Sequence, residues 1–455
     1  MKKSIWKRGG ALLMLGSMLI GVAGCAGNYE KGPENGQKNP GNALVVYAAD
    51  YPKMNPYPEN NGFEFDEAEY EAWAESQKEI APSSEEYLSG VWEFSRDTMT
   101  AFLGDAKGEN KIYSPVNIYM ALGMLAEVTD GQSREQVLGL LHAKDILELR
   151  QNASDLWLAH YCDDGRFTSK LGASMWLDES VNYVTETLQQ VAEVYRASSY
   201  RGELGTPEMN KALQNWLNEQ TGGLLKEQAE GVELDKETVL ALATTLYYQA
   251  KWDNEFNKNA TTRENFYTPG GAIECDFMHE SASGFYYWGE NFAAVEKSFE
   301  AGGGMLFVLP DENITVEELL QDEQVLNMIE NPGAWKNQKH LIVNLSVPKF
   351  DVVSKMSLVE ELQQLGVTDV FQSEVADFSP LTKESDGIFV SQVEHAARVK
   401  IDEEGCEAAA YTVIAMCGSA MPPSEEVDFV ADRPFLFVIT GRDGLPLFIG
   451  VVNQL

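Results

Sequence analysis

The segment Lys400–Pro423 reads KIDEEGCEAAAYTVIAMCGSAMPP and differs from the rest of this acidic chain. After Glu407 it carries no charged side chain until Glu425. Its even positions are small or apolar, namely Cys406, Ala408, Ala410, Thr412, Ile414 and Met416. This period-2 pattern is typical of a strand with one buried face. Since no turn and partner strand follow, we expect a strand that can join a sheet formed elsewhere in the chain.

Several other segments have strand patterns of their own. Phe389–Ile401 alternates apolar and polar residues and leads directly into the segment above, while Leu240–Trp252 is almost continuously apolar. Phe435–Ile439 and Leu447–Val451 flank the glycine turn at 441–444, which predicts a terminal hairpin.

Helix starts are marked by capping residues between these strands. Ser114 followed by Pro115 predicts a helix N-terminus. The pairs Ser133/Gln136 and Thr315/Glu318 have the spacing of capping boxes. We find no internal repeat and no second linker, so residues 86–455 are expected to form one mixed α+β domain.

The stretch from Glu403 to Thr412 resembles the reactive-loop hinge of inhibitory serpins, and Phe429–Phe437 resembles the C-terminal signature of that family. The resemblance implies the α+β serpin fold: a large central, mostly antiparallel sheet, further sheets, surrounding helices and an exposed reactive-centre loop at about 403–428. The hinge residues it implies are Glu403, Glu404, Gly405, Cys406, Glu407, Ala408, Ala409, Ala410 and Thr412.

Serpin-like function would be inhibition of a serine protease by a suicide-substrate mechanism. Counting the loop length typical of the family from Gly405 places the attacked bond at Ser419–Ala420, with Gly418 and Met421 as neighbouring choices. Small residues on both sides of the bond favour elastase-like or subtilisin-like targets. The resemblance implies a covalent complex with the protease, no catalytic residues and no cofactor, and we expect a monomer.

The resemblance also implies a set of buried polar residues, the shutter, beneath the central sheet. Its members here would be Ser114, Asn117, Thr244, Ser391 and His395. The family usually has Ser where Asn117 stands, and Asn where Thr244 stands. These departures leave the strength of the hydrogen bonding within the shutter open.

The N-terminus has the features of an export signal. Basic residues precede an apolar run over 11–23, and Val22-Ala23-Gly24-Cys25 has the form of a bacterial lipobox. We expect a signal peptide at 1–24, lipid on Cys25, a flexible and acidic linker over 25–85, and no contribution of the signal to the fold. The protein would then be anchored to a bacterial membrane by lipid alone, facing the extracytoplasmic space.

Net charge, histidine spacing and cysteine content indicate which binding partners, metal sites and disulfides to expect. The formal net charge of −37 disfavours nucleic acid and heparin-like polyanions, which bind clustered Lys and Arg. The five histidines lack metal-binding spacing, so no metal site is expected. Besides Cys25, the remaining cysteines show no disulfide framework, although a redox-sensitive bond between Cys406 and Cys417 stays open.

The sequence leaves three alternative functions to compare. A hydrolase using Ser419 and His395 is disfavoured, because no GxSxG motif is present and a nucleophile needs rigid support. A non-inhibitory serpin that is merely cleaved remains open. So does a surface lipoprotein whose loop binds a partner.

Overall fold

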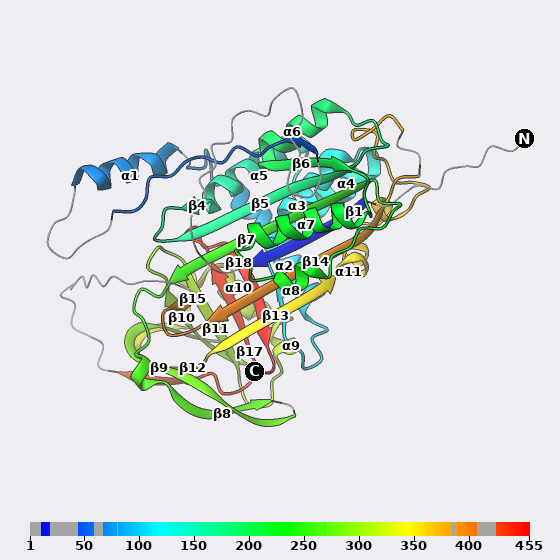
Figure 1. Ribbon diagram of the computed structural model, residues 1–455. Helices are drawn as coiled ribbons and strands as arrows, with labels where there is room; N and C mark the ends of the chain where they lie inside the picture. Colours follow the sequence, from blue (N-terminus) through cyan, green and yellow to red (C-terminus); the bar gives the residue numbers. More distant parts are fainter. Residues whose placement is uncertain are drawn as a thin grey trace, which may run out of the picture.

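The computed structural model describes residues 11–18, 44–58, 67–79, 81–268, 270–384, 387–406 and 425–455, with the backbone alone for 11–18. Two nine-stranded sheets form the framework (Figure 1). In the first sheet, the order is β1 (Ala11–Met18), β14 (Val390–Ile401), β15 (Gly405–Cys406), β7 (Leu240–Lys251), β5 (Thr168–Asp178), β6 (Ala197–Gly202) and β2 (Leu44–Tyr47), with β13 (Phe350–Ser357) beside β14 and β4 (Cys162–Asp163) beside β5.

The second sheet contains the terminal hairpin and the strand that follows the loop. Its order is β16 (Glu426–Val430), β12 (Gln338–Pro348), β9 (Gly271–Trp288), β10 (Phe292–Ser298), β11 (Gly304–Pro310), β17 (Phe435–Thr440), β18 (Pro446–Val452) and β3 (Lys111–Tyr113), with β8 (Thr262–Thr268) beside β9. The predicted hairpin is confirmed as β17 and β18, which pair antiparallel.

The helices cover the sheets and fill the space between them. They are α1 (Glu67–Glu79), α2 (Tyr87–Leu103), α3 (Pro115–Val128), α4 (Gly131–Leu140), α5 (Ile146–His160), α6 (Thr185–Tyr195), α7 (Pro207–Gln220), α8 (Lys226–Glu230), α9 (Val316–Leu319), α10 (Glu323–Glu330) and α11 (Val359–Gln364). All residues of α3 are buried, and α3 contacts both β7 and β18, so it lies between the two sheets. On the opposite face of the first sheet, α7 lies across β7 and β5 (Figure 1).

β7 and β14 are parallel to one another, and the space between them is the central feature of the first sheet. Near the end of both strands, β15 pairs antiparallel with each. Nearer their beginnings, from Val390 to Ala396 of β14 and from Leu240 to Tyr247 of β7, the backbone of β1 pairs parallel with each. We call the space between β7 and β14 the central slot. The sequence analysis expects residues 11–18 to belong to a signal that makes no contribution to the fold, whereas in the full-length chain two open strand edges accept β1 as a further strand.

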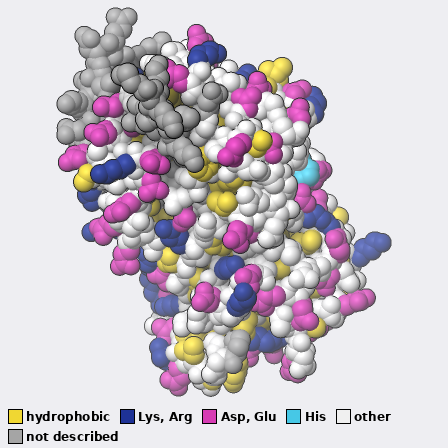
Figure 2. Space-filling view, turned by 90° about the vertical axis from the view of Figure 1, so that its right-hand side faces the viewer, with side chains coloured by type: hydrophobic (Ala, Val, Ile, Leu, Met, Phe, Trp, Pro, Cys, Tyr) yellow, Lys and Arg dark blue, Asp and Glu magenta, His cyan; other side chains and the backbone are white. Residues whose placement is uncertain are grey.

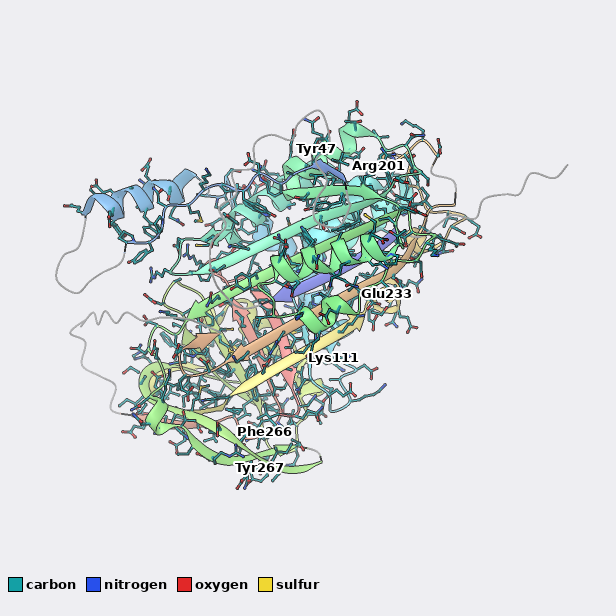
Figure 3. All side chains as sticks on the ribbon, viewed as in Figure 1. Tyr47, Lys111, Arg201, Glu233, Phe266 and Tyr267 are labelled. Carbon is teal, nitrogen blue, oxygen red and sulfur yellow. The ribbon has the colours of Figure 1, made fainter. Side chains whose placement is uncertain are left out.

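The segment predicted as a flexible linker is also partly ordered. β2 pairs antiparallel with β6 and covers that edge of the sheet, where Figure 3 labels Tyr47 and Arg201. Tyr51 stacks on Trp157, with ring centroids 5.7 Å apart, and the indole N–H of Trp73 donates to Asp164 at 3.1 Å. Partly buried aromatic side chains thus fix parts of the segment that is expected to be a flexible linker.

The alternating strands carry their side chains as the sequence predicts. On β14, the buried positions are Val390, Val393, His395, Ala397, Val399 and Ile401. On β8, Phe266 is buried and its neighbour Tyr267 is exposed, and both are labelled in Figure 3. One face of each strand therefore contributes to the core.

Candidate functional site

The hinge begins with a chain reversal at the end of β14. The Asp402 carboxylate accepts from the Glu404 N–H at 2.9 Å, and the Asp402 N–H donates to the Gly405 carbonyl at 3.0 Å. The chain then returns as β15, in which Cys406 pairs with Ile401 of β14 and with Ala250 of β7. The first residues of the hinge therefore already occupy the end of the central slot.

Gly405 is required by the narrow space between the strands. A Cβ atom placed on it would lie 2.4 Å from the carbonyl oxygen of Ala250 and 2.8 Å from the Cα of Lys251. Both atoms belong to the backbone of β7, so neither can move aside as a flexible side chain would. Only glycine allows the hinge to approach β7 this closely.

Two ion pairs fix the acidic residues before the glycine. Glu403 is 6% exposed, pairs with Lys349 at 2.5 Å and accepts from Thr261 at 2.7 Å. Burial alone would raise the pKa of Glu403, but the bonds from Lys349 and Thr261 outweigh it and hold the pKa below its usual value. Glu404 pairs with Lys258.

Two hydrogen bonds from Trp252, which directly follows β7, complete the hinge. The N–H of Trp252 donates to the Glu404 carbonyl at 3.1 Å, and its indole N–H donates to the Asp402 carbonyl at 2.9 Å. Sequence reasoning did not identify Asp402, Trp252, Lys349 or Lys258. The spacing of Asp402 and Gly405 is a turn signal that could have indicated the first of these.

The predicted shutter residues are brought together at the start of α3, with one exception. Ser114 caps α3 by accepting from the Asn117 N–H at 3.3 Å, which confirms the predicted cap. The Ser114 N–H donates to Nε2 of His395 on β14 at 3.1 Å. The Thr244 hydroxyl on β7 donates to Oδ1 of Asn117. α3 is therefore bonded to both strands that border the central slot.

His395 itself is fully buried, and burial lowers its pKa to about 3. Among the described residues its Nδ1 has no hydrogen-bond partner. His395 thus joins β14 to the N-terminus of α3.

Ser391 is the exception to the shutter prediction. It lies at the start of β14 and is exposed, while the interacting residues Ser114, Asn117, Thr244 and His395 are all buried. Ser391 therefore lies outside the buried cluster. On β14, the odd-numbered side chains face the core from Val393 onward. This alternation does not extend to the first residues of the strand, where Val390 is buried and Ser391 is exposed.

Residues 407–424 lie outside the described part of the chain. This applies to the predicted bond Ser419–Ala420, to the hinge residues Glu407, Ala408, Ala409, Ala410 and Thr412, and to Cys417 of the redox hypothesis. The chain resumes in β16, which pairs parallel with β12. Cys25 likewise lies outside the described residues.

Two further properties concern only the described residues. None of the helices seen there is both long and apolar enough to cross a bilayer. In the same ranges, no three His, Cys, Asp or Glu side chains gather in a way that could hold a metal ion.

Comparison with known proteins identifies the class. A family model described as Serpin (serine protease inhibitor) matches residues 90–455. Since this is most of the chain, the chain belongs to the serpin family. Serpin-ZX of Arabidopsis thaliana is 26% identical over 367 residues, covering 76% of this chain and 92% of its own length. The leukocyte elastase inhibitor of Homo sapiens is 27% identical over 377 residues, covering 80% and 98%.

Solved structures show the same fold. The thermophilic serpin tengpin in its native state has a TM-score of 0.71 at 25% identity, covering 89% of this chain and 97% of its own. Human thyroxine-binding globulin, solved with its ligand, has a TM-score of 0.71 at 20% identity, covering 81% and 98%, a likeness of fold alone. The predicted α+β serpin fold is confirmed.

Proposed function

We propose that this serpin inhibits a serine protease as a suicide substrate, with its loop inserting into the central slot. The observation that carries the proposal is the hinge, because β15 lies in that slot and runs antiparallel to both of its walls. A strand continuing from Cys406 in the same register would extend β15 between β7 and β14 without any change of direction.

The continued register matches small loop residues to the buried face. Ala408 would lie opposite Val399 of β14, and Ala410 opposite Ala397. Thr412 would lie opposite His395 and Thr244, at the level of the α3 cluster. The even positions of the loop would thus share the core face with Cys406, which is buried. The odd positions, including Tyr411, would face outward.

The chemical step would be ordinary acyl transfer. The protease serine attacks the Ser419 carbonyl carbon, the bond to Ala420 breaks, and the amine of Ala420 leaves with a proton from the protease. Glu407 to Ser419 then inserts behind β15 while Ser419 remains esterified. Thirteen residues at about 0.5–1.5 kcal/mol per backbone hydrogen bond would release on the order of 10 kcal/mol. That is comparable to the stability of a whole domain, about 5–15 kcal/mol, and would suffice to distort the protease.

The proposal also covers the target protease and the cellular location of the protein. Small residues at Ser419 and Ala420 favour a protease with a shallow first pocket, and the name of the human relative, leukocyte elastase inhibitor, supports an elastase-like enzyme. The lipobox at 22–25 supports a protein tethered by lipid to the outer face of a bacterial membrane.

The test is incubation of the processed chain with an elastase. We expect a covalent complex that survives denaturing electrophoresis, and a released peptide whose mass places the cut at Ser419–Ala420. Cleavage without a complex would favour the non-inhibitory alternative. If neither elastase nor subtilisin cleaved the protein or formed a complex with it, the proposal would be contradicted.

A further inference from the structure

The chain enters the first sheet at the end opposite the hinge. The register of the strands places one residue of each in a single row across the sheet: Leu44 of β2, Arg201 of β6, Leu177 of β5 and Leu240 of β7. The hinge lies at the other end of β7, where Gly405 pairs with Lys251. Lys251 is eleven residues further along β7 than Leu240, so about 37 Å separates the two ends at about 3.4 Å per residue. We call them the entry pole, where β2 and β7 begin, and the loop pole, where β15 forms (Figure 1).

Several contacts fix the segment that follows β2 to the domain. The N–H of Ala49 donates to the Ser198 hydroxyl at 2.9 Å. Tyr51 stacks on both Trp157 and Tyr161, with ring centroids 5.7 and 5.8 Å away. Together with the pairing of β2 and β6, these contacts hold the point of entry in place. The chain between the expected lipid and this fixed point is therefore residues 25–43, rather than the whole expected linker of 25–85.

Residues 25–43 limit the distance between the entry pole and the bilayer. These nineteen residues span at most about 65 Å when fully extended. Because the tether joins the domain at the entry pole, this pole lies nearer to the bilayer on average than the loop pole does. Figure 2 faces the entry pole and shows acidic and basic side chains spread over it. Charged side chains favour water, so the lipid on Cys25 would hold this pole near the membrane without inserting it.

The register of β15 would bring the cut end of an inserted loop to the entry pole. Cys406 pairs with Ala250, so each following loop residue would pair with the preceding residue of β7. Met416 would then lie opposite Leu240, in the row at which the chain enters the sheet. Ser419 would lie three residues further on, beyond the beginning of β7. The ester to the protease would therefore end at the pole to which the tether is attached.

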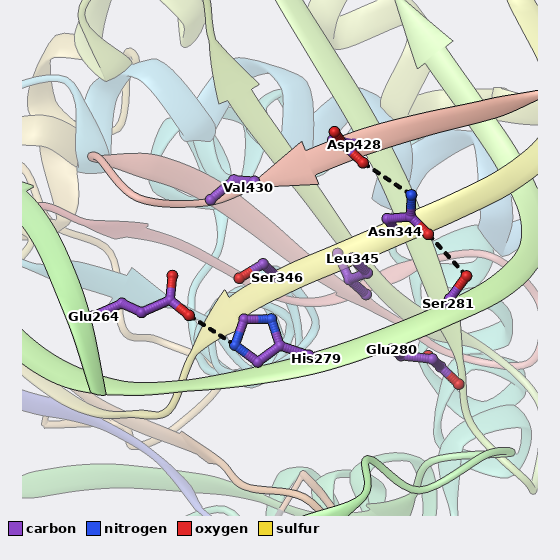
Figure 4. Close-up of a pocket in the computed structure, with 9 residues that line it drawn as sticks. All are labelled: Glu264, His279, Glu280, Ser281, Asn344, Leu345, Ser346, Asp428 and Val430. Carbon is purple, nitrogen blue, oxygen red and sulfur yellow. Dashed lines mark hydrogen bonds and ion pairs between the residues drawn. The ribbon is translucent and has the colours of Figure 1, made fainter. Parts of the chain in front are cut away.

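The part of the chain that follows the loop is held in the second sheet. β16 pairs with β12 over five residue pairs. The Asn344 amide donates to the Asp428 carboxylate at 2.9 Å and its carbonyl oxygen accepts from the Ser281 hydroxyl at 2.8 Å, as Figure 4 shows. These bonds would keep β16 in place after cleavage. Only the residues before the cut would then move with the inserting strand, and they carry the protease.

We propose that this lipoprotein transfers a trapped protease to the membrane side of the inhibitor, next to the lipid surface. The inference rests on the proposed inhibitory function and on the lipid at Cys25. An attacking protease meets the loop pole, which lies on the solution side. After insertion it would lie at the entry pole instead. A protease domain is about 40 Å across, so the span of residues 25–43 is long enough to admit it beside the bilayer.

The test measures resonance energy transfer from a donor-labelled elastase to acceptor-labelled lipid. The lipidated chain starting at Cys25 is placed in phosphatidylcholine vesicles, whose neutral surface excludes an effect of membrane charge. Two complexes are compared: the covalent complex with active elastase, and the non-covalent complex with elastase whose nucleophilic serine is replaced by alanine. The second enzyme cannot form the ester and stays at the loop pole.

We expect energy transfer to be about twofold higher or more in the covalent complex, because insertion moves the enzyme towards the bilayer over the length of β7. A variant in which residues 26–43 are duplicated is the matched control. Its longer tether lets the entry pole lie farther from the lipid, so the gain should be smaller.

Equal or lower transfer in the covalent complex would overturn the inference, and denaturing gels of the same samples show whether that complex has formed. Equal gains with the original and the duplicated tether would overturn it as well, because the tether would then not set the distance. A missing covalent complex would contradict the proposed inhibitory function and, with it, this inference.

Discussion

Asn117 and Thr244 show how a pair of residues can depart from a family pattern and still keep its interaction. Each substitution taken alone suggests weaker hydrogen bonding in the shutter, because the family usually has the amide on the strand and the hydroxyl on the helix. Here the amide belongs to α3 and the hydroxyl to β7, and the two are hydrogen bonded. The sequence reveals both substitutions, but only their spatial proximity shows that each compensates for the other.

This compensation predicts coupled effects on stability. N117S should lower the free energy of unfolding by about 1–2 kcal/mol, because buried Thr244 loses its side-chain acceptor and keeps only the residue 117 carbonyl at 3.4 Å. Adding T244N should recover most of that loss. Denaturant unfolding of the two single variants and the double variant gives the coupling energy. Strictly additive effects would show that the bond contributes little.

His395 predicts a pH dependence with a definite sign. Burial lowers its folded-state pKa to about 3, whereas unfolded histidine has a pKa of about 6.5. Between these values the unfolded state binds more protons, so stability falls as the pH decreases from 6.5 towards 3. In H395Q this part of the slope should be missing between pH 6.5 and 4.5, above the range of the carboxyl groups. Equal slopes for both proteins would contradict the burial of a neutral imidazole.

At the scale of helices and strands, local residue patterns predicted more of the observed elements than amino-acid composition did. β7, β14 and the terminal hairpin follow from apolar spacing, and the Thr315/Glu318 capping box is confirmed at α9. The Ser133/Gln136 box is wrong, because Ser133 accepts from the Asp377 N–H and Gln136 bonds to Asp369. Long-range partners took the groups that the local pattern had assigned to a cap.

The ordering of the N-terminal region was not predictable for a similar reason. β2 exists because β6 presents an open edge, and Tyr51 is fixed by Trp157 from α5. Neither partner is near in sequence. The exposed position of Ser391 likewise depends on where the sheet begins, which a family motif does not specify.

The register of β15 predicts different effects for two neighbouring alanines. A408R would place a cation against the core opposite Val399, so insertion should fail and the protein should become a substrate. A409R would face outward and should keep inhibition within about threefold, since an exposed substitution costs little. The ratio of covalent complex to cleaved product on denaturing gels measures both. Equal loss in the two variants would exclude this register.

At the scale of the whole molecule, two segments compete for one position in the first sheet. The backbone of β1 occupies the central slot that the cleaved loop would need. We therefore expect the full-length chain to form less covalent complex than a chain starting at Cys25. L13P in the full-length chain should restore inhibition, because proline cannot pair in a central strand. Equal trapping by all three proteins would show that β1 is readily displaced.

Loop insertion should also change resistance to heat. Cleavage at residue 419 without a trapped protease should raise the midpoint of thermal unfolding by more than about 10 °C, if insertion releases on the order of 10 kcal/mol. Cleaved A408R serves as the control and should show no such gain. An unchanged midpoint in the cleaved unaltered protein would contradict the insertion mechanism.

The reversal at Asp402–Gly405 has a mechanical consequence. β15 starts at the C-terminal ends of β7 and β14 and runs antiparallel to both. Each residue added to β15 therefore moves the far end of the loop towards the N-terminal ends of these two strands. Fifteen residues at about 3.4 Å each make a path of about 50 Å. In the proposed mechanism, an enzyme esterified to Ser419 would be transported from one end of the molecule to the other, so that a single cut peptide bond is converted into motion over the length of the molecule.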